Sequence, residues 1–196
     1  MEPATAPQLA LALDPTWADA ATADAWFERL THETPWRQEQ IRLFGREVTV
    51  PRLTAWVADE GLTYTYSGLT HEPSPWTDTL RAIRRRLHET TGIDFNGVLL
   101  NRYRDGEDSM GWHADDEPEL GPAPTIASVS LGAIRTFQLK HRTRKDVARV
   151  DVDLAHGSLL VMRPPTQAHW LHQIPKRRGR DAPGERINLT FRRIES

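Results

Sequence analysis

Polar and apolar residues alternate without a break along a segment near the end of the chain, residues 186–192. Side chains of a β-strand point in turn to its two faces, so Ile187, Leu189 and Phe191 share one apolar face. The opposite face carries two guanidinium groups, an amide and a hydroxyl but no carboxylate: Arg186, Asn188, Thr190 and Arg192. Because arginine pairs with a carboxylate through two parallel hydrogen bonds, this face suits a small dicarboxylic acid. A solvent-facing strand is the alternative interpretation.

Helical periodicity is confined to the N-terminal half of the chain. Apolar residues at helical spacing predict one helix over residues 19–31. A second helix is expected to begin with Ser74 as its N-cap and Pro75 as its first residue, and to end near Gly92. Between the two helices, residues 39–43 and 46–50 predict a β-hairpin with Phe44 and Gly45 at its tip.

Short strands dominate the rest of the chain. Turn residues separate seven of them, at 98–103, 126–131, 136–139, 147–153, 158–162, 169–174 and 186–192. Many short strands without intervening helices are typical of a sandwich or barrel, and this pattern is closer to a jelly roll than to a doubly wound sheet. We therefore expect an α+β fold that is mainly β. Residues 1–13 have no usable period and are expected to be mobile, and residues 14–196 to form a single domain.

Composition narrows the chemistry further. The 196 residues include no cysteine, so any metal must be held by histidine and carboxylate groups. No apolar stretch approaches the roughly eighteen residues that a membrane helix needs, and no signal peptide is evident, so a cytoplasmic protein without a membrane partner is expected. The net charge of -2 does not predict nucleic-acid binding, although basic residues cluster at 81–86, 140–145 and 176–180.

His113 and Asp115 place an imidazole and a carboxylate on the same side of an extended segment, after a turn-rich approach at 104–111. A second histidine would complete a triad that leaves coordination positions free for substrate and oxygen on ferrous iron. His169 and His172 are the candidates. They have opposite parity within a strand, so only one of them is expected to face the site.

Three motifs in this order resemble the AlkB family of iron- and 2-oxoglutarate-dependent dioxygenases. They are His113-x-Asp115, His172 within residues 169–176, and the alternating Arg-x-Asn-x-Thr-x-Arg of residues 186–192. The resemblance covers roughly residues 40–194 and is closest to the human-type double-strand DNA repair homologues. It implies a double-stranded β-helix, the jelly roll of these enzymes, with its core at about 95–194 and a nucleotide-recognition lid at about 36–70.

The resemblance also implies the ligands of the site. It makes His113, Asp115 and His172 the iron ligands and leaves His169 as a structural neighbour. It assigns the arginine-rich face to 2-oxoglutarate, with Arg192 on the distal carboxylate. The remaining residues implied for the cosubstrate are Arg186, Asn101, Tyr103, Asn188 and Thr190.

A pocket for the target base and a wedge into the DNA are implied in the same way. The pocket residues are Tyr64, Tyr66, Ser67 and Glu117. Aromatic faces and a carboxylate favour a cationic base, although a packed, half-buried strand is the alternative for the tyrosines. Phe44 and Gly45 match a hairpin tip that fills the gap left by a flipped base, and a buried core phenylalanine is the alternative for Phe44.

The function implied is oxidative demethylation of 1-methyladenine and 3-methylcytosine in double-stranded DNA, with single-stranded DNA as a further candidate substrate. A monomeric enzyme would use Fe(II), 2-oxoglutarate and O2 and release formaldehyde, succinate and CO2. One alternative is the same chemistry on RNA or on a protein. Another is a nucleic-acid-binding module with an inactive iron site, but the presence of every ligand and both arginines argues against it.

Overall fold

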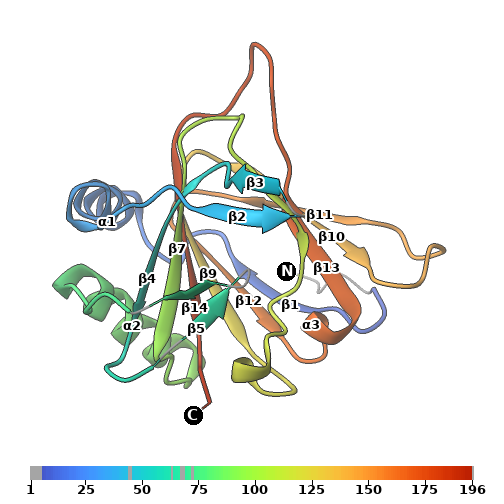
Figure 1. The fold of residues 1–196 in the computed structure, drawn as a ribbon, viewed down its shortest axis with the longest axis horizontal. Coiled ribbons are helices and arrows are strands. Elements are labelled where there is room, and N and C mark those ends of the chain that lie inside the picture. The colour runs from blue at the N-terminus through green and yellow to red at the C-terminus, as the bar shows by residue number, and fades with distance from the viewer. Residues whose placement is uncertain (1–5, 44–45, 63, 67–68, 72, 196) are drawn as a thin grey trace.

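Two antiparallel sheets form the framework of the computed structural model. The structure describes residues 6–43, 46–62, 64–66, 69–71 and 73–195. For residues 41–43, 46, 64–66 and 69–71 it describes the backbone alone. A six-stranded sheet has the order β1-β12-β9-β14-β7-β4, and a four-stranded sheet the order β11-β10-β13-β8 (Figure 1). The strands are β1 (Ala10–Asp14), β4 (Leu53–Ala58), β7 (Gly97–Tyr103), β8 (Met110–His113), β9 (Ile126–Gly132), β10 (Arg135–His141), β11 (Val150–Leu154), β12 (Ser158–Arg163), β13 (Trp170–Ile174) and β14 (Arg186–Arg192). This architecture confirms the predicted mainly β fold of the jelly-roll type.

One hydrophobic core lies between the six-stranded sheet and two helices, α1 (Ala20–Glu33) and α2 (Asp78–Thr91). Figure 1 shows both helices on the same side of that sheet. The apolar face of β14, with Ile187, Leu189 and Phe191, belongs to this core, as do Leu80 and Ile83 of α2. The apolar half of the alternating segment is therefore the half that holds the helices against the sheet.

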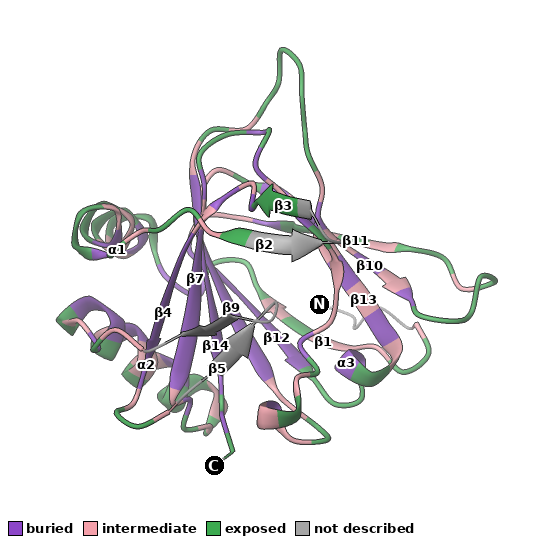
Figure 2. Cartoon of the chain, viewed as in Figure 1, coloured by how far each residue is buried: buried purple, intermediate pink, exposed green. Residues whose placement is uncertain are grey.

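A second core lies between the two sheets and includes Leu99, Phe137, Leu139 and Trp170. The polar face of β14 points into this space between the two sheets, because side chains alternate along a strand and the helices cover its apolar face. Figure 2 shows β7, β9, β12 and β14 buried over most of their lengths, and every residue of β14 is buried. The solvent-facing alternative for this strand is wrong.

The second helix begins later than the sequence predicts. Its N-cap is Thr77, whose Oγ1 accepts a hydrogen bond from the Leu80 backbone N–H at 3.3 Å. Ser74 lies before the helix, where it forms an isolated bridge with Val57 of β4 and donates its backbone N–H to the Trp56 carbonyl. The predicted end is confirmed, since Gly92 is the C-cap with a φ of 71°, a left-handed conformation that glycine adopts without strain.

The N-terminal segment is also more ordered than predicted. Residues 10–14 form β1, which pairs with β12 along its whole length. The prediction of a mobile segment through residue 13 is therefore wrong for residues 10–13. The alternation of alanine and leucine there was too short to stand out, and pairing with β12 supplies the stability that the local sequence lacks. A short helix, α3 (Thr166–His169), likewise delays β13 so that it starts at Trp170.

Smaller elements complete the fold. The predicted hairpin is present as β2 (Gln40–Leu43) and β3 (Arg46–Thr49), while its tip at Phe44 and Gly45 lies outside the described residues. A second pair, β5 (Tyr64–Tyr66) and β6 (Leu69–His71), and a 3-10 turn, η1 (Pro118–Leu120), were not predicted. None of the helices in the described part of the chain has the length and apolar character needed to cross a lipid bilayer.

Candidate active site

His113, Asp115 and His172 meet between the two sheets. Strands β8 and β13 are antiparallel neighbours, and their register sets His113 directly opposite His172. The two imidazole rings are 4.2 Å apart at their centroids and inclined by 72°. Asp115 follows β8, and its Oδ2 lies 3.7 Å from His172 Nε2. One potential ligand atom from each of the three side chains lies within 4.8 Å of the others, which is compact enough to hold a single metal ion.

The protonation states of this triad suit metal binding. Burial and the nearby His113 together lower the pKa of His172 to about 3 although Asp115 opposes them, so this imidazole is neutral at pH 7. Burial likewise lowers the pKa of His113. Burial alone raises the pKa of Asp115, but Arg192 and the two histidines more than reverse this effect and hold the pKa well below its usual range. The site therefore offers two neutral imidazoles and one carboxylate.

The donor set fits ferrous iron. Two imidazoles and a carboxylate, with no thiolate in the chain, are the ligands that mononuclear non-haem Fe(II) sites use. Nδ1 of His113 lies 2.8 Å from the Gly111 carbonyl, which makes Nδ1 the protonated nitrogen and leaves the lone pair on Nε2. Nδ1 of His172 is buried without a hydrogen-bond partner among the described residues.

Gln167 of α3 is a contact that sequence reasoning missed. Its Oε1 accepts a hydrogen bond from the Asp115 backbone N–H at 3.0 Å, and the side chain is 2% exposed. Thr166, the preceding residue, accepts a hydrogen bond from the Ala10 N–H of β1 at 2.9 Å. The position of the carboxylate ligand therefore depends on α3 and β1, and no local pattern links these segments to residue 115.

The polar face of β14 lines a cavity that also contains the triad. Asn101 and Tyr103 of β7 line it too, as their shared parity on that strand implies. Arg186 is 1% exposed, and its Nη2 donates to Ser130 Oγ at 2.9 Å. Its Nε and Nη1 are buried and have no hydrogen-bond partner among the described residues. Buried guanidinium donors without a partner are groups that an anionic carboxylate can satisfy.

The two arginines of β14 occupy different ends of this cavity. Arg192 Nη2 lies 2.5 Å from Asp115 Oδ1, so this guanidinium belongs to the metal end. Arg186 lies beside Tyr103, with its Cζ 5.3 Å from the ring centroid. The register agrees, because Arg186 pairs with Tyr103 and Arg192 with Gly97, at opposite ends of β7. The expectation that Arg192 binds the distal carboxylate does not match this placement.

The remaining predicted cosubstrate residues are held by hydrogen bonds, Asn188 and Thr190 on the β9 side of β14 and Asn101 on the β7 side. Asn188 donates to Ser128 Oγ at 2.8 Å and accepts from Thr190 Oγ1 at 3.1 Å. Asn101 Oδ1 accepts from Arg52 Nε at 2.7 Å, so its amide nitrogen is the end left for the cavity. The sequence predicted no role for the two serines of β9 that take part in these contacts, Ser128 and Ser130.

The described residues do not show the other histidine candidate, the predicted base pocket or the predicted wedge in contact with the triad. His169 lies in α3 and contacts Gln8 and His141. Glu117 is half-buried and is the N-cap residue of η1, two residues beyond Asp115. For the base pocket, β5 carries Tyr64 and Tyr66 with only their backbone described. Ser67, Phe44 and Gly45 lie outside the described residues.

Comparison with known proteins points in one direction. The family model described as the 2OG-Fe(II) oxygenase superfamily matches residues 10–192. The DNA oxidative demethylase ALKBH2 of Mus musculus is 48% identical over 183 residues, which is 89% of this chain and 76% of the relative. The human alpha-ketoglutarate-dependent dioxygenase alkB homolog 3 is 44% identical over 193 residues, 93% of this chain and 65% of the relative. A 2OG-Fe(II) oxygenase-family oxidoreductase from Burkholderia pseudomallei shares the fold, with a TM-score of 0.57 at 17% identity over 93% of this chain and 84% of that chain.

Proposed function

Since the chain belongs to the 2OG-Fe(II) oxygenase superfamily, we propose that it is an AlkB-type enzyme that removes N-methyl groups from alkylated DNA bases. The proposal covers 1-methyladenine and 3-methylcytosine as substrates. It also retains two expectations from the sequence, a monomeric state and a cytoplasmic location.

The observation that carries the proposal is that the buried triad and the buried guanidinium group of Arg186 line the same cavity. His113, Asp115 and His172 would hold Fe(II), and the polar face of β14 would hold 2-oxoglutarate. When bound, iron and 2-oxoglutarate supply the activation of O2 that hydroxylates the N-methyl carbon, yielding succinate, CO2 and, on loss of the methyl group, formaldehyde. The protein holds these groups in a cavity between two sheets and limits the access of bulk water.

We assign the distal carboxylate of the cosubstrate to Arg186 rather than to Arg192. Arg186 lies at the end of the cavity away from the triad, with two buried donors that have no partner among the described residues, whereas Arg192 is bonded to Asp115 at the metal end. Asn101 and Tyr103 would complete the distal site, and Arg192 would orient the carboxylate ligand and favour the anionic end of the cosubstrate near the metal. Asn188 and Thr190 would support the cosubstrate between the two arginines, with Asn188 held by Ser128 and Thr190 by Asn188.

The substrate side of the proposal rests on the relatives and on the chemistry of the predicted pocket. Tyr64, Tyr66, Ser67 and Glu117 would surround the flipped base. A carboxylate and aromatic faces favour a base that carries a positive charge on its methylated ring. The β2–β3 hairpin would act as the lid, with Phe44 and Gly45 entering the gap in the duplex.

RNA or protein as the substrate is not favoured. The relative with 48% identity is named a DNA oxidative demethylase, and so is its human counterpart with 46% identity. A wedge at a hairpin tip is useful on a duplex and has no evident use on a protein.

The proposal can be tested with purified protein, Fe(II) and 2-oxoglutarate. Oligonucleotides containing 1-methyladenine or 3-methylcytosine should yield the unmodified base, with formaldehyde and succinate released in equal amounts. Single-stranded DNA, duplex DNA and RNA of the same sequence should be compared, with the unmethylated duplex as the control. Demethylation of RNA alone, or succinate release without repair of any methylated base, would overturn the proposal.

A further inference from the structure

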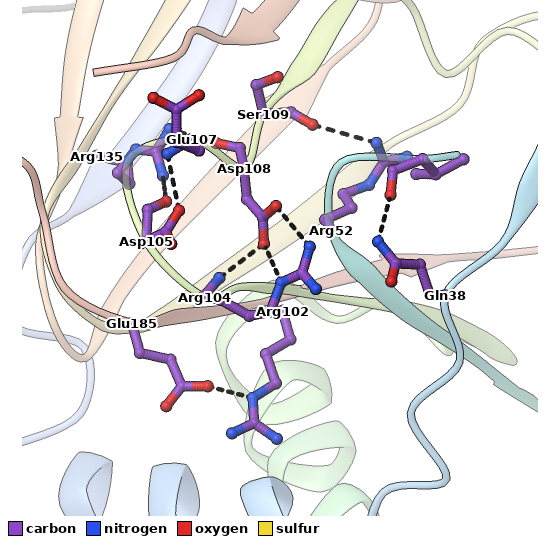
Figure 3. Close-up of polar contacts among 11 residues, drawn as sticks. Gln38, Arg52, Arg102, Arg104, Asp105, Glu107, Asp108, Ser109, Arg135 and Glu185 are labelled. Carbon is purple, nitrogen blue, oxygen red and sulfur yellow. Dashed lines mark hydrogen bonds and ion pairs between the residues drawn. The ribbon is translucent and has the colours of Figure 1, made fainter. Parts of the chain in front are cut away.

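Arg135, the first residue of β10, is a buried arginine that is not among the residues lining the cavity. It is 1% exposed, and it donates to three backbone carbonyls: Asp105 at 3.1 Å, Asp108 at 2.9 Å and Pro175 at 2.7 Å. Figure 3 shows it against Asp105 and Asp108 in the β7–β8 connection. Arg135 therefore ties this connection, which leads into β8 and His113, to the segment that follows β13.

Tyr103 joins Arg135 to the cavity. The Arg135 Cζ lies 5.5 Å from the centroid of the Tyr103 ring, and the Arg186 Cζ lies 5.3 Å from the same centroid. Tyr103 itself is 1% exposed and lines the cavity. Because both guanidinium groups contact one aromatic ring, the position of Arg135 fixes the position of a side chain that faces the cosubstrate.

The far end of the cavity is consequently rich in positive charge. Burial lowers the pKa of Arg186 to about 10, and Arg135 acts on it in the same direction as a like charge. Burial also lowers the pKa of Arg135, while Asp108 and Asp105 partly oppose this change. The Asp108 carboxylate is already bound by Arg104 at 2.8 Å. An incoming carboxylate would therefore relieve repulsion between two buried cations as well as pair with one of them.

We propose that Arg135 is a positioning residue that makes the cavity selective for a 2-oxo acid with a second, distal carboxylate. It acts through Tyr103 and through its charge beside Arg186, without touching the acid. The inference rests on the proposed function, because it concerns the cosubstrate of the same site. It predicts that loss of Arg135 weakens binding of the distal carboxylate specifically, whereas a general packing defect would weaken binding of every 2-oxo acid.

The test compares two acids on one protein preparation. 2-Oxoglutarate and 2-oxopentanoate have the same chain length, but the second has a methyl group in place of the distal carboxylate. Both are titrated calorimetrically into Mn(II)-loaded wild-type protein, Arg135→Gln and Arg135→Lys. Arg149→Gln is the control, because Arg149 is a half-exposed arginine that pairs with Asp151 of β11, the edge strand of the same sheet. The ratio of the two affinities does not depend on the fraction of protein that is folded.

For Arg135→Gln we expect the Kd of 2-oxoglutarate to rise about tenfold or more, with that of 2-oxopentanoate changed by less than about twofold. Arg135→Lys should show a smaller change in the same ratio, since an ammonium keeps the charge but cannot bond three carbonyls. In turnover, the KM for 2-oxoglutarate should rise while kcat at saturation stays within about twofold of wild type.

Two results would overturn the inference: an unchanged affinity ratio in Arg135→Gln, or an equal loss for both acids. If Arg135→Gln gives no folded protein, the ratio measured for Arg135→Lys decides in the same way. Failure of the proposed function gives a different result: wild-type protein would not repair methylated DNA, whereas the two affinities and their ratio are measured without any DNA substrate.

Discussion

Arg192 and Asp115 form a buried ion pair that joins the end of β14 to the residue two positions after β8. Their Nη2 and Oδ1 atoms are 2.5 Å apart, and the side chains are 1% and 2% exposed. The pair connects the two sheets at the point where His113 and His172 face each other. It therefore holds the carboxylate beside both imidazoles, and loss of either partner would leave a buried charge uncompensated.

Replacing His113 or His172 by alanine should abolish tight binding of Fe(II), because a facial site with one of three ligands removed does not hold the ion. Metal content after anaerobic loading and desalting measures this directly, and turnover of 2-oxoglutarate should be lost in parallel. His169→Ala is the matched control, since His169 contacts Gln8 and His141 instead of the triad. Normal metal retention in His172→Ala would show that the triad has been wrongly assigned.

The two arginines of β14 should respond differently to substitution. Arg186→Ala should raise the KM for 2-oxoglutarate about tenfold or more, because the distal carboxylate loses a charged, forked donor. Fe(II) retention should be unchanged. Arg186→Lys should recover only part of the loss, since an ammonium cannot form both hydrogen bonds.

Arg192→Ala should instead lower stability, by about 3–5 kcal/mol, because Asp115 is left buried without its counter-charge. Urea denaturation of the metal-free protein measures this effect, and metal retention should also change. Identical behaviour of the Arg186 and Arg192 variants in both assays would contradict the division of roles.

Protonation of Asp108 at acid pH should lower the free energy of unfolding. Its carboxylate accepts hydrogen bonds from the Arg104 backbone N–H at 2.9 Å and from Arg104 Nε at 2.8 Å. Burial raises the pKa of Asp108, but the bonds from Arg104 outweigh burial, so the pKa lies below its usual value of 3.8. A carboxyl with a lowered folded-state pKa stabilises the protein above its unfolded pKa, and this contribution is lost as pH falls through the folded pKa.

Asp108→Asn should therefore lower the free energy of unfolding at pH 7 by about 1–3 kcal/mol, with a smaller difference from wild type below about pH 4. Urea titrations at pH 7 and pH 3 measure both values. Asp146→Asn is the control, because Asp146 pairs with Arg144 at 2.6 Å but its side chain is 68% exposed. A difference between wild type and Asp108→Asn that is the same at both pH values would refute the pKa argument.

Phe44 should matter mainly for duplex substrates. Flipping a base out of a duplex leaves a gap, whereas a single strand has already lost most of its stacking and pairing. Phe44→Ala should lower activity on methylated duplex DNA by about tenfold or more, a factor that needs only roughly 1.4 kcal/mol, and leave single-strand activity nearly unchanged.

Val48→Ala in β3 is the control for Phe44, because Val48 is an apolar residue of the same hairpin that is 39% exposed. Melting temperatures of both variants complete the test. A parallel loss of both activities in Phe44→Ala, together with a lower melting temperature, would favour a buried core phenylalanine over a wedge.

The sequence by itself determined the features that depend on local order along the chain. Alternation in residues 186–192 separated an apolar face from a polar one. In the structure the apolar face packs in the core beneath the helices, and the polar face lines the cavity that contains the triad. The 39–43 and 46–50 pattern predicted the hairpin, and the glycine at position 92 predicted a helix end. These predictions succeeded because side-chain periodicity and glycine conformation are set by neighbouring residues.

Tertiary structure alone decided which residues meet across the fold. Thr77 is the helix cap instead of Ser74, because Ser74 is paired with β4 and the helix starts after it, and residues 10–14 became a strand because β12 pairs with them. The assignment of Arg192 to Asp115 depends on the registers of two different sheets, and so do the contacts of Gln167 and Arg135. A sequence pattern repeats over a few residues, whereas these contacts join segments tens of residues apart, so only the packed sheets could bring them together.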